Sequence, residues 1–323
     1  MKLKSFFYLF PSFQCQFCAV RTAPHCTQKN GKRRGQQRYK CCDCGQQFEQ
    51  RRRKRDAWVT EAYEKYSTHK QTYAELGREY GKHPKTLRKY FDAHAAVTGE
   101  IIAEPEEVFV SMDATFFGHG YGILVCRAKS RNLYWKEIVT EKIVHYEEAL
   151  DALLASHHRF SGFVIDGRKG VIAMLRRLFP DLPIQLCQFH QIQTVKQYIP
   201  RNAITVAAQE IRFLALRLTK MPSARFIGEL QAWHERWGTF LKEKTVTSET
   251  GKWQYTHRRL RSAYRSLKTN LPYLFTFESH PGMPNTTNSC DGSFSHWKRK
   301  VQLHRGIAPA RRKKMIDYLL ENS

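Results

Sequence analysis

Three aspartates set far apart along the chain are the residues whose types and positions could do chemistry. Asp113 and Asp166 each stand at or just past the end of an apolar run, in VFVSMD and GFVID, and Asp291 follows in the polar, helix-like stretch NTTNSCDGSF. Carboxylates that meet in space can hold divalent metal ions against a phosphate group. Taken singly, Asp113 or Asp166 has a plainer interpretation as a turn acid at the end of a strand. The metal interpretation therefore needs a scaffold that brings all three together.

The residues after Pro105 predict a sheet that could position the first two acids. Apolar, β-branched and aromatic runs predict strands, and apolar residues at helical spacing predict helices between them. The predicted strands cover residues 108–114, 122–127, 133–139, 163–165 and 184–187, and the predicted helices cover residues 146–158 and a segment with Ile172, Leu175 and Leu178. The short spacings between the first three strands favour antiparallel hairpins. The predicted fold class is α/β, in which acids at strand ends can meet at one edge of the sheet.

Length and charge narrow the class of protein. A chain of 323 residues is long enough for about two to four folded units. Lys and Arg number 54 against 29 for Asp and Glu, a formal charge of +25. Such an excess favours a polyanionic partner, with nucleic acid as the leading candidate. The cations cluster within residues 29–40, 51–55, 298–300 and 311–314, although a solvated face is the plainer interpretation of any single run.

The N-terminal stretch and the cysteines indicate the compartment. Residues 1–13 are apolar and aromatic, but Pro11 and Ser12 interrupt them and no small-residue cleavage site follows. No later window approaches the roughly 20 apolar residues of a membrane span. We therefore expect a soluble, intracellular protein. The nine cysteines are an odd number, and in a reducing compartment paired Cys-x-x-Cys motifs indicate metal binding instead of disulfides.

Two Cys-x-x-Cys pairs near the start predict a structural zinc site. The pairs are separated by 22 residues, close to the spacing of zinc-binding knuckles. Each pair presents two thiolates, and two pairs complete a tetrahedron around Zn²⁺ without a large core. The four predicted ligands are Cys15, Cys18, Cys41 and Cys44, and the hairpin predicted between the pairs carries cations that include Arg33 and Arg34. Residues 1–50 are therefore a predicted zinc ribbon, whose contact with DNA is plausible from these cations.

Residues 72–93 predict a helix-turn-helix. Leu76 and Tyr80 belong to a short amphipathic helix, Gly81 supplies the turn, and Pro84 suits the first position of a second helix. The second helix would turn Leu87 and Phe91 inward. It would leave outside a polar face of Lys85, Thr86, Arg88 and Lys89. Such a face fits a DNA major groove; an ordinary helical hairpin packed on its neighbours is the alternative. With a further helix predicted over 56–67, the domain covers residues 51–100.

The order of these features resembles DDE transposases with a ribonuclease H-like core, and specifically bacterial insertion-sequence transposases related to the Mutator-like group. The blocks that carry the resemblance are the zinc ribbon, the helix-turn-helix, and residues 112–115, 165–167, 187–190 and 285–306. The resemblance implies that Asp113 and Asp166 are the first two catalytic acids, which with a third acid hold Mg²⁺ or Mn²⁺. It also implies that Cys187 and His190 are a Cys-x-x-His marker. A Cys and a His one helical turn apart cannot close a zinc site alone, and packing is their plainer interpretation.

Asp291 departs from the family pattern, which usually has Glu there. Asp is one methylene shorter, so its oxygens reach about 1 to 1.5 Å less far, whereas Mg²⁺ demands near-ideal octahedral geometry. The site could be weakened, rebuilt by a small helix shift, or inactive. The nearest upstream acid, Glu278, lies in a predicted loop and is a poorer candidate. Lys298 and Arg299 follow on the same predicted helix, where they could hold the backbone of a DNA end or be solvated cations.

Together these features predict a transposase that binds the ends of an insertion sequence and catalyses metal-dependent strand cleavage and strand transfer. The core would cover residues 105–190 and 276–323, split by an all-helical insertion over 191–275. The expected partners are double-stranded DNA and at least one further copy of the chain, in the bacterial cytoplasm at the nucleoid. One alternative is an inactive or domesticated transposase that acts as a DNA-binding protein, for which Asp291 is the main hint. A transcription regulator built on residues 1–100 would leave the later residues unexplained.

Overall fold

A computed structural model describes residues 27–33, 36–41, 44–49, 57–94, 107–129, 131–246, 251–304 and 306–322. The chain divides into two compact units, residues 1–62 and 63–323. Helix α1 (Ala57–Thr68) crosses that boundary. Within the described ranges, no helix combines the length and the apolar composition needed to cross a membrane.

The first unit contains a small antiparallel sheet in the order β1-β2-β3. Its strands are β1 (Thr27–Arg33), β2 (Gln36–Cys41) and β3 (Gln47–Glu49). Cys41 is buried at the end of β2, and Cys44 is exposed in the turn that follows. The N–H of Gly45 donates to the carbonyl of Cys41 at 3.0 Å and closes this turn. The predicted hairpin is thus present, with Arg33 exposed at the end of β1, whereas Cys15, Cys18 and Arg34 lie outside the described residues.

The second unit begins with the predicted pair of short helices, α2 (Tyr73–Glu79) and α3 (Pro84–Ala93). Thr72 and Glu75 form a capping box at the start of α2, which satisfies N–H groups that the first turn leaves unpaired. Gly81 turns the chain with a φ of 60°, a conformation that favours glycine. Leu87 and Phe91 are buried. The four polar residues predicted to lie outside, Lys85, Thr86, Arg88 and Lys89, are all exposed.

The basic side chains of the last helix, α11 (Pro309–Glu321), contact other elements of the same unit. Arg311 donates two hydrogen bonds of 2.7 Å to the carboxylate of Asp92 in α3. Lys314 donates to the backbone carbonyls of Phe91 and Asp92 at 2.9 and 3.0 Å, and Lys313 pairs with Glu137. The basic run at 311–314 therefore holds α11 to its neighbours.

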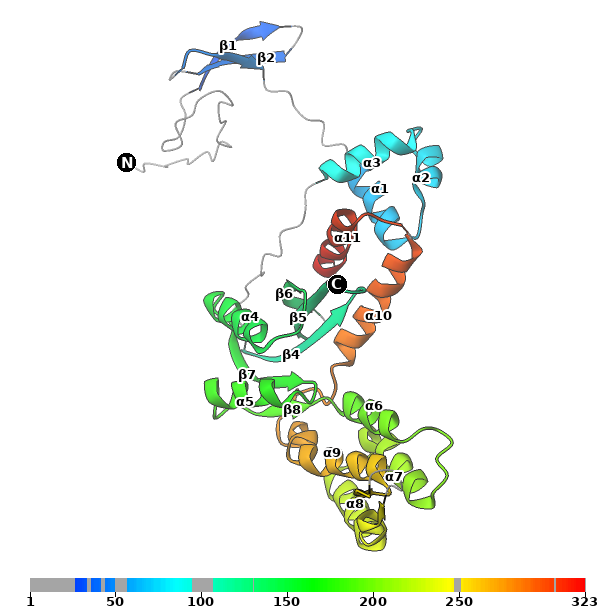
Figure 1. The fold of residues 1–323 in the computed structure, drawn as a ribbon. Coiled ribbons are helices and arrows are strands. Elements are labelled where there is room, and N and C mark those ends of the chain that lie inside the picture. Colours follow the sequence, from blue (N-terminus) through cyan, green and yellow to red (C-terminus); the bar gives the residue numbers. More distant parts are fainter. Residues whose placement is uncertain are drawn as a thin grey trace, which may run out of the picture. The chain divides into compact units, whose positions relative to one another are not determined.

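A five-stranded mixed sheet forms the centre of the second unit, in the order β6-β5-β4-β7-β8 (Figure 1). Its strands are β4 (Glu107–Phe116), β5 (Gly122–Ala128), β6 (Arg131–Ile138), β7 (Arg159–Ile165) and β8 (Ile184–Leu186). The first three strands pair antiparallel, as their short connections predict, whereas β4–β7 and β7–β8 pair parallel. Parallel pairing requires crossover connections, which α4 (Ile143–Ala155) and α5 (Lys169–Leu178) provide. The predicted α/β class is confirmed.

The residues 191–275, predicted to be all-helical, also contain a small hairpin. Helices α6 (Gln188–Tyr198), α7 (Val206–Leu216), α8 (Ser223–Trp237) and α9 (Arg258–Leu274) make up most of this insertion. Strands β9 (Lys244–Val246) and β10 (Trp253–Tyr255) pair antiparallel within it, so the all-helical prediction is wrong. Lys244 lies 4.0 Å from the centre of the Trp253 ring, and this cation–π contact helps to hold so short a hairpin.

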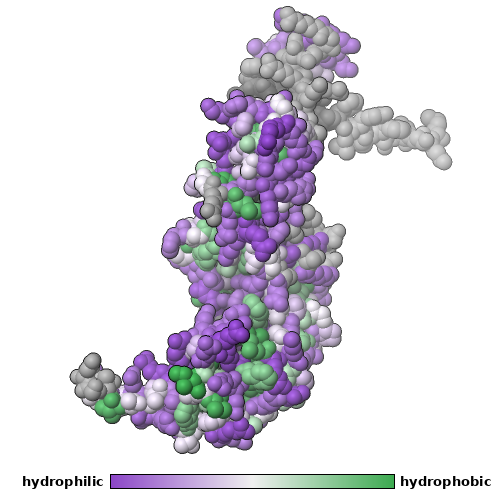
Figure 2. Space-filling model, turned by 90° about the vertical axis from the view of Figure 1, so that its right-hand side faces the viewer, coloured by the Kyte–Doolittle hydropathy of each residue, from purple (hydrophilic) through white to green (hydrophobic). Residues whose placement is uncertain are grey.

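The insertion and the sheet share one hydrophobic core. Buried side chains continue from Met112 and Phe163 in the sheet, through Val195 in α6, to Phe226 in α8 and Leu267 in α9. The insertion is therefore packed on the sheet and is no separate appendage. Figure 2 shows apolar residues gathered over the lower part of the molecular face in view, at the level where the insertion lies in Figure 1. Its exposed apolar side chains include Ile204, Val206, Phe213 and Trp253.

Candidate active site

The register of the sheet sets Asp166 beside Asp113. Strands β4 and β7 run parallel, and their last paired residues are Met112 and Ile165. Asp113 and Asp166 are the next residues along each strand. The sequence suggested that Asp113 lies at the end of its strand. In the structure β4 continues to Phe116 and pairs there with β5. Asp113 is instead buried within β4 at 7% exposure, and Asp166 is half-buried where β7 stops.

Alternation along β4 separates its core face from its functional face. Val108, Val110 and Met112 belong to the hydrophobic core, so Asp113 points to the opposite face. Helix α10 (Asn288–Leu303) packs against β4, and its first turn carries Asp291. Thus the third acid comes from a helix, as predicted, and the first two come from neighbouring strands.

Electrostatic coupling links the three acids. Burial raises the pKa of Asp113 to about 7, and the charges of Asp291 and Asp166 add to the rise while His190 opposes it. Burial and the charge of Glu141 raise the pKa of Asp166, again against the charge of His190. Buried carboxylates that repel one another favour any cation that relieves the repulsion. These pKa shifts therefore indicate a site where binding of a proton or a metal ion is favourable.

Cys187 and His190 gather around Asp291. Sγ of Cys187, one ring nitrogen of His190 and one carboxylate oxygen of Asp291 all lie within 4.8 Å of one another. His190 Nε2 is 3.9 Å from Asp291 Oδ1. A hydrogen bond with Cys187 is the main cause that raises the pKa of His190 to about 9, with the charges of Asp113 and Asp291 adding to it. The raised pKa favours the protonated imidazole of His190 at neutral pH, next to the carboxylate of Asp291.

Thr287 completes this arrangement, and sequence reasoning assigned it no role. Its N–H and its hydroxyl each donate to Cys187 Sγ at 3.2 Å. The hydroxyl also lies 3.4 Å from His190 Nδ1 and 3.4 Å from Asp291 Oδ2. Although burial raises the pKa of the Cys187 thiol, hydrogen bonds from His190 and Thr287 outweigh it and lower that pKa. We call Cys187, His190 and Thr287 the clasp, since they join α6 to the start of α10.

Two further contacts seat α10 at the sheet. The N–H of Gln188 donates to the carbonyl of Asn285, and the Asn285 side chain donates back to Gln188 Oε1, both at 3.0 Å. On the sheet side, Arg127 of β5 donates to Ser293 Oγ at 2.6 Å. The blocks at 187–190 and 285–291 are therefore in direct contact, which their separation in sequence conceals. Lys298 is half-buried and Arg299 exposed farther along α10.

Glu141 is a fourth acid near the site that the sequence pattern did not reveal. It accepts a hydrogen bond of 2.5 Å from the Tyr146 hydroxyl and pairs with Arg168 at 2.5 Å. Both contacts are made by Oε1 of Glu141, and the charge of Glu141 helps to raise the pKa of Asp166. Glu278, the poorer candidate for the third acid, accepts from the N–H of Ser223 at 2.9 Å and so caps α8.

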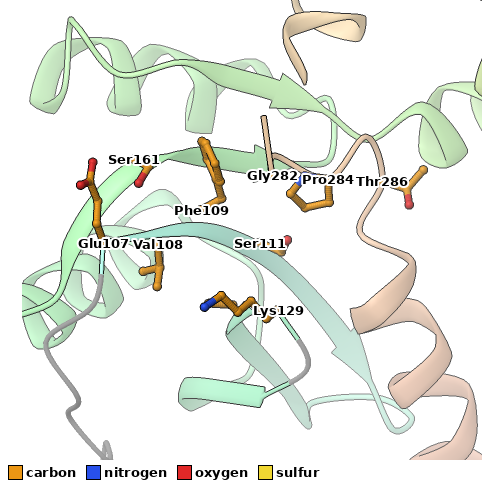
Figure 3. Close-up of a pocket in the computed structure, with 10 residues that line it drawn as sticks. Glu107, Val108, Phe109, Ser111, Lys129, Ser161, Gly282, Pro284 and Thr286 are labelled. Carbon is orange, nitrogen blue, oxygen red and sulfur yellow. The ribbon is translucent and has the colours of Figure 1, made fainter. Parts of the chain in front are cut away.

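Two cavities lie near this part of the sheet, and one of them has an acid of the site in its lining. One, of about 440 Å³, lies on the same face of β4 as Asp113, between Phe109 and Ser111 of the strand and the loop with Gly282 and Pro284 (Figure 3). The other, of about 350 Å³, has Asp166 and His190 in its wall. Asp166 therefore has open space beside its carboxylate, where a substrate could reach it.

Comparison with known proteins adds no family: no family model matches this chain, and none of the curated proteins is significantly similar to it. The functional conclusion depends on the chemistry of the site.

Proposed function

We propose that this protein is a metal-dependent DNA transposase, which cleaves phosphodiester bonds at the ends of a mobile element and joins them to target DNA. The observation that carries the proposal is the parallel register of β4 and β7, which sets Asp166 beside Asp113, with Asp291 of α10 coupled to Asp113 by charge. The resemblance to DDE transposases with a ribonuclease H-like core points the same way.

The three acids fit a hard divalent cation. Carboxylate oxygens are the ligands that Mg²⁺ and Mn²⁺ prefer, and Asp113, Asp166 and Asp291 would hold the ions. When bound, two such ions activate the attacking oxygen and stabilise the leaving oxygen of an in-line displacement. The chain's own contribution is positional: the sheet register sets two carboxylates on neighbouring strands, and α10, which packs against β4, carries the third.

Zinc at Cys187, His190 and Asp291 is the competing use of the same residues. The sulfur of Cys187 already accepts two hydrogen bonds from Thr287 and interacts with His190. Zinc would bind the neutral imidazole of His190, and the raised pKa of His190 opposes that form at neutral pH. Magnesium at the carboxylates is therefore the better match. The structural Zn²⁺ of the N-terminal ribbon remains a separate prediction.

The remaining chain supplies cations for DNA. The net charge of +25 and the exposed polar face of α3 support binding of a duplex, with α3 in the major groove. Assembly on paired element ends would require at least two copies of the chain. The second candidate function is a DNA-binding protein without catalysis, which the shorter side chain of Asp291 favours.

A cleavage assay separates the two candidates. The substrate is a duplex that carries the DNA flanking the gene, incubated with Mg²⁺ and the wild-type chain, Asp113→Asn, or Asp181→Asn as a matched control at an exposed acid. The transposase predicts that cleavage and joining products appear with wild type and control and disappear with Asp113→Asn. Equal product, or none, from all three proteins would exclude the enzyme and leave the DNA-binding candidate.

A further inference from the structure

The cavity of about 350 Å³ beside Asp166 has an unusual lining for a neighbour of a phosphate site. Its floor is the turn after β7, and one wall is a single face of α6. Four amide side chains line it, with one hydroxyl: Gln191, Gln193, Gln197, Asn270 and Thr194. Among the described residues of the lining, Arg168 is the only basic side chain besides His190, and its guanidinium is paired with Glu141 at 2.5 Å. The lining therefore suits a neutral polar group better than a phosphate.

A directed chain of hydrogen bonds orients Asn270. The Ser266 hydroxyl donates to the carbonyl of Ala263 at 2.8 Å, because a carbonyl oxygen can only accept. Ser266 must then accept from Gln191 Nε2, at 3.0 Å. This leaves Gln191 Oε1 to accept from Asn270 Nδ2 at 2.7 Å. The orientation of the Asn270 amide is thus set by the backbone carbonyl of Ala263, at the other end of this series of hydrogen bonds.

This orientation leaves a donor and an acceptor of Asn270 unused. Nδ2 carries two protons, of which Gln191 takes one. Within the described residues, neither Asn270 Oδ1 nor the side-chain amide of Gln193 has a protein hydrogen-bond partner in the structure. Asn270 also lies against the turn, because a Cβ added at Gly167 would come within 3.3 Å of Nδ2. A side chain so held presents a preoriented donor–acceptor pair next to the candidate metal ligand Asp166.

We propose that this cavity binds one nucleobase, unstacked from the DNA strand whose phosphodiester lies at the three acids. The proposal rests on the proposed function, since DNA is the ligand. An Asn side chain pairs through its acceptor and donor with N6 and N7 of adenine, so adenine is the preferred base. A base inside a duplex cannot enter such a pocket and must leave the stack, which costs least where the strand is already single.

The test uses single-stranded pentanucleotides whose four outer residues are abasic. The central residue carries adenine, cytosine, guanine or thymine, or is abasic as well. Affinities are measured by fluorescence anisotropy for the wild-type chain, Asn270→Ala, and Gln231→Ala as a control at an exposed amide of α8. We expect wild type and Gln231→Ala to prefer adenine over the abasic strand by about 5- to 150-fold, the worth of one bidentate pair. Asn270→Ala should lose that preference while its affinity for the abasic strand stays unchanged.

The outcomes separate this proposal from the proposed function. Equal affinity of the wild-type chain for all five strands, absence of binding, or the same base preference in Asn270→Ala would overturn the nucleobase pocket. An abasic affinity that falls in Asn270→Ala would also count against it, because the change would then act on the fold. The transposase proposal is tested separately by the cleavage assay, in which these oligonucleotides are not used.

Discussion

The sheet and helix α10 contribute acids to the same site by different means. Asp113 and Asp166 are placed by backbone pairing between β4 and β7, which cannot shift by one residue without moving every side chain to the other face. Asp291 is placed by side chains, through the clasp and through Ser293 on Arg127. The difference shows which part of the site tolerates change. The strand acids are rigid, whereas the helix acid depends on a few replaceable contacts.

Removal of a strand acid should have the largest effect. Asp166→Asn keeps the shape of the side chain but loses its charge, so strand cleavage should fall on the order of 10⁴-fold, as when one member of a catalytic unit is lost. The apo protein should become more stable at pH 8, since burial and Glu141 disfavour the ionised Asp166. Cleavage rates and thermal melts measure the two effects. A destabilised Asp166→Asn protein would contradict the electrostatic account of this acid.

The pH dependence of stability tests the burial of Asp113. Its pKa rises from 3.8 in an ordinary environment to about 7 in the folded chain, so the folded state holds its proton more tightly. The resulting stability is complete below pH 4 and is lost as pH rises through 7. The loss is on the order of 4 kcal/mol. Urea unfolding without metal, at pH 5 and pH 8, should show this decline in wild type.

Two comparisons isolate the contribution of Asp113. Asp113→Asn should flatten the decline, because its side chain has no proton to lose. Added Mg²⁺ should stabilise wild type far more at pH 8 than at pH 5, since the ion competes with the proton for the carboxylate. Identical pH profiles of wild type and Asp113→Asn would assign the decline to other groups.

The clasp should have a smaller effect, confined to the helix acid. Thr287→Val keeps the shape but removes the hydroxyl that contacts Cys187, His190 and Asp291. Loss of such supporting contacts around a metal ligand typically costs 10- to 100-fold in metal affinity or activity. We expect the Mg²⁺ concentration for half-maximal cleavage to rise by about that factor.

Matched variants distinguish positioning from folding. Thr287→Ser restores the hydroxyl and should recover most of the Mg²⁺ affinity. Thr286→Val changes the adjacent residue, whose hydroxyl accepts only from the N–H of Asn288 at 3.4 Å, and should leave Mg²⁺ dependence near that of wild type. If Thr286→Val and Thr287→Val weaken the metal response equally, the clasp does not position Asp291.

The sequence predicts the sheet better than it predicts the site around it. Dense apolar runs such as residues 163–165 have few alternatives to a buried strand, and they were found where predicted. The end of β4 was misjudged, because polar Asp113 and Thr115 interrupt its apolar run although pairing with β5 carries the strand to Phe116. The hairpin of β9 and β10 was missed since each strand has three residues, too few to show a period. The role of Thr287 depends on contacts about 100 residues away, which no local pattern encodes.

The smallest effect is expected where Asp291 is exchanged for the family's usual residue. Asp291→Glu moves the carboxylate about 1 to 1.5 Å farther from α10, and Mg²⁺ tolerates little change in ligand distance. Because α10 is held by side-chain contacts, a small shift of the helix can absorb the extra methylene, and cleavage should stay within about tenfold of wild type or rise. Asp291→Ala, which has no ligand to offer, should instead lose activity as Asp166→Asn does. Activity lost with Glu but kept with Ala would mean that position 291 is no metal ligand, and the difference between strand-borne and helix-borne acids would then disappear.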